Sequence, residues 1–421
     1  MKFIISKFKI NLENYIKESH IPGIVVVFLL VKLLFVKDSN KKLSVLTRVL
    51  RHYPNIAFHK SILNYSMTLA KSDKIFNNGK NRIQLNHPII IKPYISKKEK
   101  GILLMKFEHE LKKVVNSIAL ETIQDRYHIV SLPSGHGLFT PQLLKLAARS
   151  SQRFYVMPVQ SRDRISCLRL GPHCQVLPFN NASWVKKELF SCYKGHRDID
   201  CLMVAQWGKV KRHWMLFKAL SKLPPEITAV CVGVPVGDGR TVDSIRQEAR
   251  VYGVHDRVTI IEGPSQEDLR NYFQRAKVFC ALSYKEGTFN SVAESLMAGT
   301  PVIMFKNAHI GTKELINENN GALVSSISEL RDKITYFLKK DNHEEIRKNA
   351  QQLVDAASNC EKLNHLLKED AFNLGYEWSC DIESVYCVRL KFYYENPEWK
   401  SIFKEDYSYL NDNGVEIKRF L

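Results

Sequence analysis

The segment from Glu286 to Pro301 constrains the fold more than any other part of the chain. It reads EGTFNSVAESLMAGTP and follows the apolar run 278–282, which is typical of a buried strand. Residues of the types that cap a helix start come next, namely Thr288, Asn290 and Ser291. Gly299 stops the expected helix, and a second apolar run, 302–305, follows the proline. The segment therefore predicts a βαβ unit within an α/β fold.

Two carboxylates lie near the carboxyl end of the first strand of this unit, where open α/β sheets bind ligands. Gly287 lets a ligand approach the backbone, and the first amides of a helix favour an anion such as phosphate. Carboxylates repel phosphate but accept hydrogen bonds from hydroxyls. Glu286 and Glu294 therefore indicate a nucleotide diphosphate sugar, with one carboxylate on the sugar and the other on the ribose. The alternative is a surface helix with two solvated glutamates.

The same residues resemble the donor-site signature of retaining glycosyltransferases with the GT-B fold, above all glycosyltransferase family 4. The matching motifs are Ser283-Tyr284-Lys285-Glu286-Gly287, Glu294 and Gly299-Thr300-Pro301-Val302. Residues 311–316 and 320–324 match the segment that follows the donor helix in that family. The resemblance covers roughly residues 198–345 and is weak before them.

The resemblance implies an α/β chain with two Rossmann-like domains facing a cleft. We expect a helical N-terminal extension at 1–85, an acceptor domain at 86–190, a donor-binding domain at 191–345 and a C-terminal helical tail at 346–421. Apolar runs predict strands in both α/β domains, at 102–105, 128–131, 154–157, 201–204, 229–232, 258–261, 278–282 and 302–305. Helical spacing predicts helices near 41–74, 108–121 and 140–149. In this family the last helices often cross back over the first domain, and 392–394 could pack in that way.

A basic loop follows the first strand of the expected donor domain. It contains Lys211 and Arg212, whose charges could balance a diphosphate and assist its departure. Gln206 stands where the family usually has an arginine, and glutamine cannot neutralise phosphate. The resemblance implies donor contacts from Gln206, Lys211, Arg212, Gly287, Thr288, Phe289, Asn290 and Glu294, with Glu286 as a catalytic residue. A solvated basic loop is the alternative.

The first α/β domain offers a glycine-rich turn, 133–137, after a predicted strand. Gly135 and Gly137 would let a donor or acceptor approach, and His136 could orient a hydroxyl or act as a base. A structural loop histidine is the alternative to this catalytic role. Arg162 lies after the next strand and could contact an anionic acceptor, unless it is salt-bridged.

The composition of the chain limits the classes of partner that it could bind. The formal net charge of the 421 residues is +19, which attracts anionic substrates, anionic lipid or nucleic acid. No nucleic acid is expected, because zinc-finger spacing, RNP-like strands and arginine-rich tracts are missing from the sequence. The nine cysteines include no CxxC pair, which indicates a reducing compartment. No metal or other cofactor is expected, because protein cations would balance the diphosphate.

An apolar run at 24–36 is interrupted by Lys32 and preceded by several lysines. It is short for a membrane span and has no small-residue cleavage site. A helix of 22–37 in the interface of an anionic membrane and a buried helix are both compatible with this pattern, and a transmembrane anchor is the third alternative. The sequence thus predicts a cytoplasmic protein, with peripheral attachment to the inner face of the plasma membrane as one form of it.

Together these features predict a retaining, hexosyltransferase-type enzyme. It would move a sugar from a nucleotide diphosphate sugar to a glycan or lipid-linked acceptor during synthesis of a bacterial surface polysaccharide. A degenerate GT-B protein that binds a glycan or a protein partner is the first alternative, supported by Gln206 and the short first domain. Another enzyme on the same fold, such as an epimerase or a phosphorylase, is the second.

Overall fold

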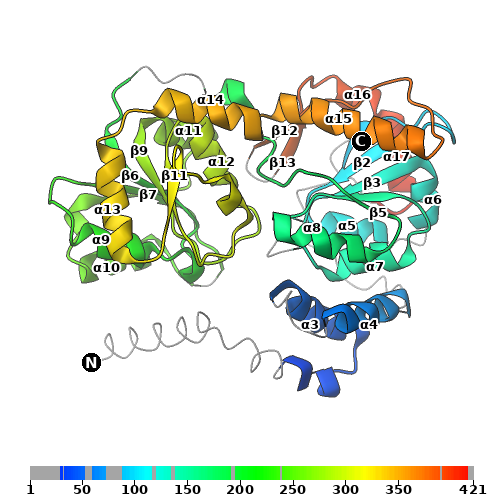
Figure 1. Cartoon of the computed structure of the whole chain (residues 1–421), viewed down its shortest axis with the longest axis horizontal. Coiled ribbons are helices and arrows are strands. Elements are labelled where there is room, and N and C mark those ends of the chain that lie inside the picture. Colours follow the sequence, from blue (N-terminus) through cyan, green and yellow to red (C-terminus); the bar gives the residue numbers. More distant parts are fainter. Residues whose placement is uncertain are drawn as a thin grey trace. The chain divides into compact units, whose positions relative to one another are not determined.

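The computed structural model describes residues 29–31, 33–52, 59–72, 88–115, 120–133, 138–190, 195–237, 239–388 and 391–415. The chain divides into two compact units. Unit 1 consists of residues 1–74 and 139–149, and unit 2 consists of residues 75–138 and 150–421. Figure 1 shows the elements of both units.

Unit 1 is helical. Its labelled helices are α3 (Ser39–His52), α4 (His59–Ser72) and α7 (Pro141–Arg149). Side chains three or four positions apart form its buried face, among them Leu43, Leu46, Leu50 and Leu63. The sequence placed residues 140–149 in the first α/β domain, whereas in the structure α7 groups with the N-terminal helices.

The first sheet of unit 2 has the strand order β1-β2-β3-β4-β5. Its strands are β1 (Ile89–Lys92), β2 (Gly101–Met105), β3 (Tyr127–Ser131), β4 (Phe154–Val156) and β5 (Cys174–Val176). Strands β2 to β5 are parallel, and β1 pairs antiparallel with β2. The short helices α5 (Glu108–Val115), α6 (Leu120–Arg126) and α8 (Ser161–Cys167) connect them. The apolar runs of the sequence predicted β2, β3 and β4 but not the short edge strands β1 and β5.

The second sheet is entirely parallel and has the order β11-β10-β9-β6-β7-β8. Its strands are β6 (Ile199–Val204), β7 (Ala229–Gly233), β8 (Val258–Glu262), β9 (Ala276–Ala281), β10 (Val302–Phe305) and β11 (Gly321–Val324). Its helices are α9 (His213–Leu220), α10 (Val242–Val251), α11 (Gln266–Arg275), α12 (Asn290–Met297) and α13 (Ile327–Leu338). Strands β7 and β8 extend the sheet on one side of β6, and the next strand along the chain, β9, pairs with β6 on its other side. The carboxyl ends of β6 and β9 therefore form the topological switch point at which such sheets bind ligands.

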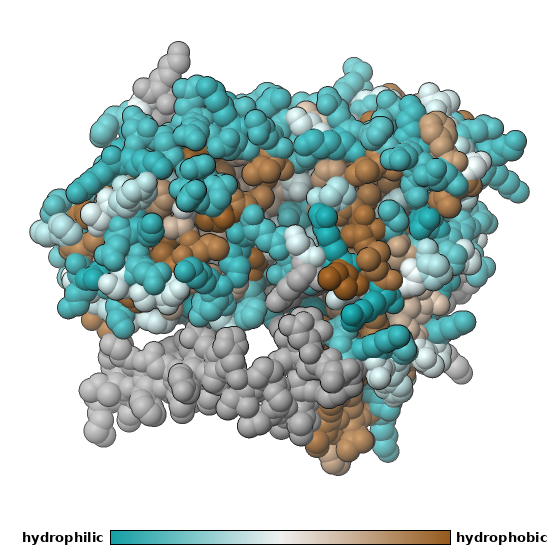
Figure 2. Space-filling view, in the orientation of Figure 1, coloured by the Kyte–Doolittle hydropathy of each residue, from teal (hydrophilic) through white to brown (hydrophobic). Residues whose placement is uncertain are grey.

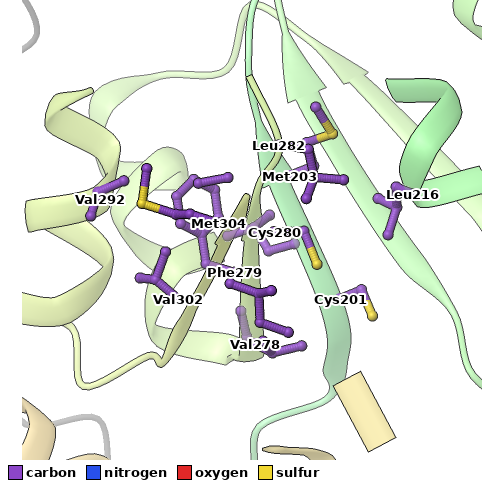
Figure 3. Close-up of a cluster of buried hydrophobic side chains, with 14 of the residues drawn as sticks. Cys201, Met203, Leu216, Val278, Phe279, Cys280, Leu282, Val292, Val302 and Met304 are labelled. Carbon is purple, nitrogen blue, oxygen red and sulfur yellow. The ribbon is translucent and has the colours of Figure 1, made fainter. Parts of the chain in front are cut away.

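The core of the second sheet explains why its strands read as continuous apolar runs. Helices cover both faces of a parallel sheet, so side chains on both faces are buried. Figure 3 shows Val292 of α12 on one side of the sheet and Leu216 of α9 on the other, with β9 between them. Phe279 and Cys280, which are adjacent in β9, are both fully buried.

The chain passes between the two sheets twice, at neighbouring points. The first passage follows Val185 and the second reaches Asp355, and these residues form an isolated parallel bridge. The Val185 amide donates to the Val354 carbonyl at 2.9 Å, and the Ala356 amide donates to the Val185 carbonyl at 2.9 Å. Residues 186–354, which carry the second sheet, thus begin and end side by side.

The tail after Asp355 packs against the first sheet, as the sequence analysis suggested for 392–394. It comprises α15 (Ala356–Asn373), β12 (Val385–Val388), β13 (Lys391–Tyr394), α16 (Trp399–Ile402) and α17 (Lys404–Asp412), preceded by α14 (His343–Val354). The Tyr394 hydroxyl donates to the Ile90 carbonyl at 2.6 Å, and the Tyr407 hydroxyl accepts from the Ile90 amide at 3.1 Å. The tail is not wholly helical, because β12 and β13 form a hairpin that the sequence analysis did not anticipate.

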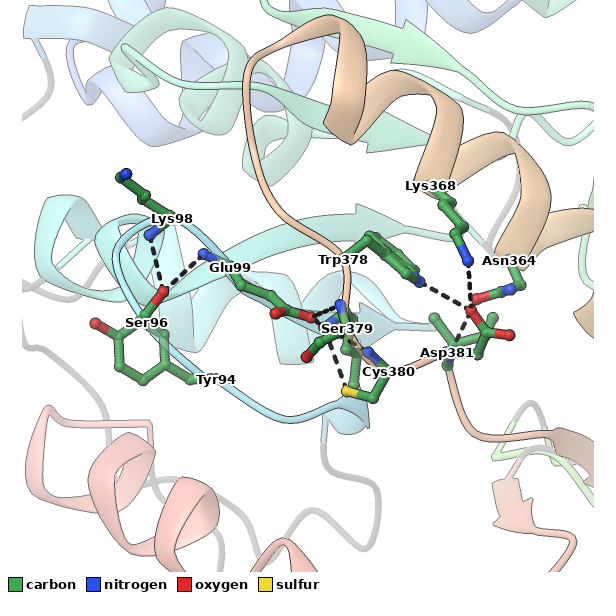
Figure 4. A network of polar contacts seen from close by, with 12 residues as sticks. Tyr94, Ser96, Lys98, Glu99, Asn364, Lys368, Trp378, Ser379, Cys380 and Asp381 are labelled. Carbon is green, nitrogen blue, oxygen red and sulfur yellow. Dashed lines mark hydrogen bonds and ion pairs between the residues drawn. The ribbon is translucent and has the colours of Figure 1, made fainter.

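A buried ion pair fixes the segment between α15 and the hairpin (Figure 4). Lys92 Nζ lies 2.6 Å from Glu99 Oε1, which also accepts from the Ser379 amide at 2.6 Å. Burial alone would raise the pKa of Glu99, but the hydrogen bonds from Lys92 and Ser379 outweigh it and lower the pKa to about 2. Glu99 therefore stays ionised and joins β1, β2 and the tail.

Candidate functional site

The candidate site lies at the switch point of the second sheet, on the loops that follow β6 and β9. The loop after β6 ends in a short 3₁₀ helix, Lys209–Lys211, and the loop after β9 carries Glu286. The two loops are joined by a hydrogen bond from the Tyr284 amide to the Val210 carbonyl, at 2.9 Å. A third loop, after β10, supports them, because the Glu286 amide donates to the His309 carbonyl at 3.1 Å.

The side chains of Lys211 and Glu286 form an ion pair at this point. The lysine side chain is 12% exposed and the glutamate side chain 17% exposed, so both are largely shielded while still open to solvent. Lys211 Nζ also lies 5.6 Å from the centre of the Phe289 ring. The structure thus brings together a cation suited to phosphate and a carboxylate suited to a sugar hydroxyl, from loops 75 positions apart.

Arg212 requires a correction, because its side chain points into the protein rather than toward a diphosphate. It is 3% exposed. Its Nε donates to the Leu282 carbonyl at 2.8 Å, and its guanidinium lies 5.1 Å from the ring centres of both Tyr284 and Phe305. Its backbone has a φ of 58°, in the left-handed region that non-glycine residues rarely adopt. Arg212 therefore positions the carboxyl end of β9 and is not placed as a phosphate ligand.

The start of α12 also differs from the expectation of a side-chain cap. The helix begins at Asn290, and Phe289 occupies the N-cap position without a side-chain hydrogen bond to the helix. The Thr288 hydroxyl is buried and has no hydrogen-bond partner among the described residues. Gly287 is buried, and its carbonyl accepts from the Gly311 amide at 2.9 Å. The helix start thus offers backbone amides to an anion from outside the protein.

Asn290 and Glu294 share one face of α12, since they are four residues apart. Asn290 Nδ2 contacts the Cys387 sulfur of β12 at 3.9 Å, and the Glu294 charge acts on the same thiol. Burial raises the pKa of Cys387, so the thiol is neutral. Lys106, which directly follows β2 of the first sheet, also donates to Cys387.

Lys106 was not predicted as a site residue from the sequence. Its position directly after the predicted strand 102–105 could have indicated it. Its side chain is almost fully buried, and it lies 5.2 Å from the centre of the Phe392 ring. Its backbone amide donates to Glu110 at 2.7 Å. Burial raises the pKa of Glu110 to about 7, so this carboxyl is partly protonated at neutral pH.

The remaining predicted residues fall in different places. Gln206 is exposed just beyond β6, at the edge that carries Lys211. Gly135, His136 and Gly137 lie outside the described residues. Arg162 belongs to α8, which follows β4 of the first sheet.

His213 and Trp207 form a buried layer beneath the loop after β6. Their ring centres are 5.5 Å apart, and Trp207 Nε1 donates to Glu262 Oε2 at 3.1 Å. Burial is the main reason why the pKa of His213 falls to about 3, and the charges of Arg240 and Lys211 act in the same direction. His213 therefore stays neutral at physiological pH and adds no charge to the loop.

Residues 186–353 match the family model described as glycosyl transferases group 1. This part of the chain is a group 1 glycosyl transferase domain. The match coincides with the second sheet and includes Lys211, Glu286 and Glu294. A comparison with curated protein sequences finds no match.

Solved structures place the glycosyl transferase domain and its surroundings in the GT-B fold. The chain is similar to sucrose-phosphate synthase from Thermosynechococcus elongatus, with 17% identity, a TM-score of 0.51 and coverage of 65% of this chain and 74% of that one. It is similar to Alr3699/HepE of Anabaena, solved in complex with UDP, with 17% identity, a TM-score of 0.51 and coverage of 63% and 79%. The expectation of a GT-B α/β fold is thereby confirmed.

Proposed function

We propose that the chain transfers a hexosyl group from a nucleotide diphosphate sugar to a glycan or lipid-linked acceptor, with retention at the anomeric carbon. The observation that carries the proposal is the Lys211–Glu286 pair at the switch point of a parallel sheet. In the transfer, the bond from the anomeric carbon to the diphosphate breaks, a bond from that carbon to the oxygen of an acceptor hydroxyl forms, and the hydroxyl proton passes to the departing diphosphate. The donor site must therefore stabilise both a departing anion and a sugar that becomes positively charged.

The proposal gives each part of the site one role. Lys211 and the backbone amides of Thr288 and of the first turn of α12 bind the diphosphate, where they stabilise its growing charge. Glu286 binds the donor sugar, and Glu294 binds the ribose. The diphosphate charge is balanced without a metal ion or another cofactor in this proposal. Gln206 contributes a hydrogen bond rather than a charge.

Binding of a nucleotide is the first measurement, and uridine is the first base to test because the Anabaena neighbour was solved with UDP. UDP at about 100 times its dissociation constant should raise the melting temperature by about 2–4 °C. GDP and sugar nucleotides would be compared in the same assay. Lys211→Met should abolish most of the shift, because it removes the cation that faces the diphosphate.

Exposed Glu318 supplies the matched control, since Glu318→Gln changes a charge in the same domain away from the site. This variant should keep the full shift. If the wild-type protein shows no shift with any nucleotide while its fold is intact, the enzyme proposal fails. The degenerate, non-catalytic alternative would then stand.

We also propose that the enzyme acts in surface polysaccharide synthesis while attached to the inner face of an anionic membrane. No helix among the described residues is long and apolar enough to cross a membrane. Within the segment 22–37, the structure describes residues 29–31 and 33–37, where Val31, Leu34 and Phe35 are 47%, 80% and 81% exposed. Apolar side chains beside lysines are suited to the interface of an anionic membrane.

Deletion of residues 1–37 should move the protein from the membrane fraction to the soluble fraction, as measured by sedimentation. The double change Leu34→Ser/Phe35→Ser should act in the same direction. Ile165 in α8 and Leu168, which directly follows α8, are also exposed apolar residues, at 64% and 66%. The double change Ile165→Ser/Leu168→Ser is therefore the control for Leu34→Ser/Phe35→Ser. Equal pelleting of the deleted and full chains would contradict membrane attachment through this segment.

A further inference from the structure

A basic pocket lies at the amino-terminal edge of the second sheet. It is lined by the segment before β6, the start of β9, the ends of α12 and α13, and the first turns of α14, and its volume is about 480 Å³. Glu286 and Lys211 follow the carboxyl ends of β9 and β6, so the candidate donor site occupies the opposite edge. Strands of six residues separate the two edges by roughly 20 Å. The pocket is therefore distinct from the donor site.

The charge of the pocket is strongly positive. Five of its lining residues are permanently basic, namely Arg197, Lys277, Lys339, Lys340 and Arg347, whereas Asp341 and Glu344 are acidic. Five positive and two negative charges leave three positive charges with both lining histidines neutral. The Glu344 carboxylate also pairs with Lys348 at 3.0 Å, and Lys277 with Asp200 at 2.8 Å. Several cations facing one concave surface attract a multiply charged anion.

Arg197 is held rigidly at this pocket. Its guanidinium donates to the carbonyls of Ala276 and Ala298 at 2.6 Å and 2.8 Å, and to the Thr300 hydroxyl at 2.6 Å. Carbonyls and a hydroxyl carry no net charge, so these bonds fix the cation in place without neutralising it. A fixed planar cation loses little conformational entropy when it binds an oxyanion.

The start of α14 adds a second set of donors. This helix has 12 residues, and its N-cap residue, Asn342, makes no side-chain cap. The Asn342 amide group donates instead to the Asn319 carbonyl at 2.8 Å. Arg347 is four positions beyond His343 and thus covers the first turn of the helix. Its Nε is buried and has no hydrogen-bond partner among the described residues.

We propose that this pocket binds a phosphate or diphosphate group of a ligand other than the sugar donor. Arg197, Arg347 and the lysines at the end of α13 supply the charge, and the open start of α14 supplies amide donors. The surface over α14 is mostly hydrophilic in the view of Figure 2, which suits a charged ligand. The phosphate could belong to a soluble molecule or to a lipid headgroup, and both present the same oxygens to the pocket.

Inorganic pyrophosphate is the probe for the soluble form, titrated into the full chain by calorimetry. Because pyrophosphate could also enter the donor site, the titration is repeated with Lys211→Met, in which only the pocket should bind. In that background, Lys340→Glu and Arg347→Glu should each weaken binding about tenfold. Lys333→Glu is the control, because Lys333 is an exposed residue of α13 whose Nζ lies 5.3 Å from the Tyr336 ring, as Lys340 Nζ lies 5.5 Å from it.

Vesicles of phosphatidylcholine with and without phosphatidylglycerol distinguish the two sources of phosphate. Loss of binding to anionic vesicles in Lys340→Glu and Arg347→Glu, but not in Lys333→Glu, would support a lipid headgroup. Unchanged vesicle binding with weakened pyrophosphate binding would support a soluble ligand. If the pocket variants match Lys333→Glu in both assays, the proposal is overturned. Nucleotide binding at the donor site is measured separately, so its failure would not be confused with this result.

Discussion

Glu286→Gln is expected to lower kcat for sugar transfer by about 100-fold to 1000-fold while leaving nucleotide affinity nearly unchanged. The substitution keeps the shape of the side chain but removes the negative charge that would stabilise a positively charged sugar in the transition state. An interaction that is stronger in the transition state than in the bound substrate affects kcat more than binding. Initial rates and UDP binding would be measured on the same preparation.

The loss of the Lys211–Glu286 ion pair has to be separated from the loss of the catalytic charge. Lys211→Met removes the same pair from the other side, and it should weaken nucleotide binding as well as slow transfer. Glu318→Gln should leave both quantities unchanged. Near-normal transfer by Glu286→Gln would remove this residue from the catalytic site.

Arg212→Met should produce the largest loss of stability, with the free energy of unfolding falling by about 2–4 kcal/mol. The change leaves the Leu282 and Ser283 carbonyls without their guanidinium donor and removes the cation beside two aromatic rings. Urea denaturation followed by near-ultraviolet circular dichroism would measure the loss. Transfer should fall with it, because the carboxyl end of β9 carries the Glu286 loop.

The left-handed backbone of Arg212 allows a second comparison at the same position. Both Arg212→Ala and Arg212→Gly remove the guanidinium, but glycine adopts a φ of 58° without strain. The glycine variant should therefore be about 1 kcal/mol more stable than the alanine variant. A stable Arg212→Met protein with weakened UDP binding would instead restore Arg212 as a phosphate ligand.

The meeting of Lys211 and Glu286 could be predicted from the sequence for a simple reason. Each residue follows an apolar strand, and parallel strands end at the same edge of a sheet. The orientation of the Arg212 side chain could not be predicted, because the local sequence pattern does not indicate a positive φ at a non-glycine residue. Likewise, Thr288 and Asn290 are residue types that commonly cap helices, but neither occupies the N-cap position of α12. Phe289 occupies it, and the Thr288 hydroxyl has no hydrogen-bond partner among the described residues.

Contacts between residues that are far apart in the sequence could not be predicted either. The Lys92–Glu99 pair is local, but its third partner, Ser379, lies 280 positions away. The grouping of α7 with α3 and α4 depends on packing between segments about 70 to 110 positions apart. The β12–β13 hairpin is stabilised by contacts with Trp184 and the first sheet rather than by a strong turn signal. Such partners become visible only when the chain is folded.

The bridge between Val185 and Asp355 has a consequence for how this chain could be rebuilt. The glycosyl transferase domain begins and ends at two adjacent backbone positions, so it is an insertion in the rest of unit 2. Replacing residues 186–354 with the corresponding segment of a relative would require only two junctions, both at one spot. Donor preference could thus be exchanged, during evolution or by engineering, while the half of the protein built on the first sheet and its tail kept its own sequence.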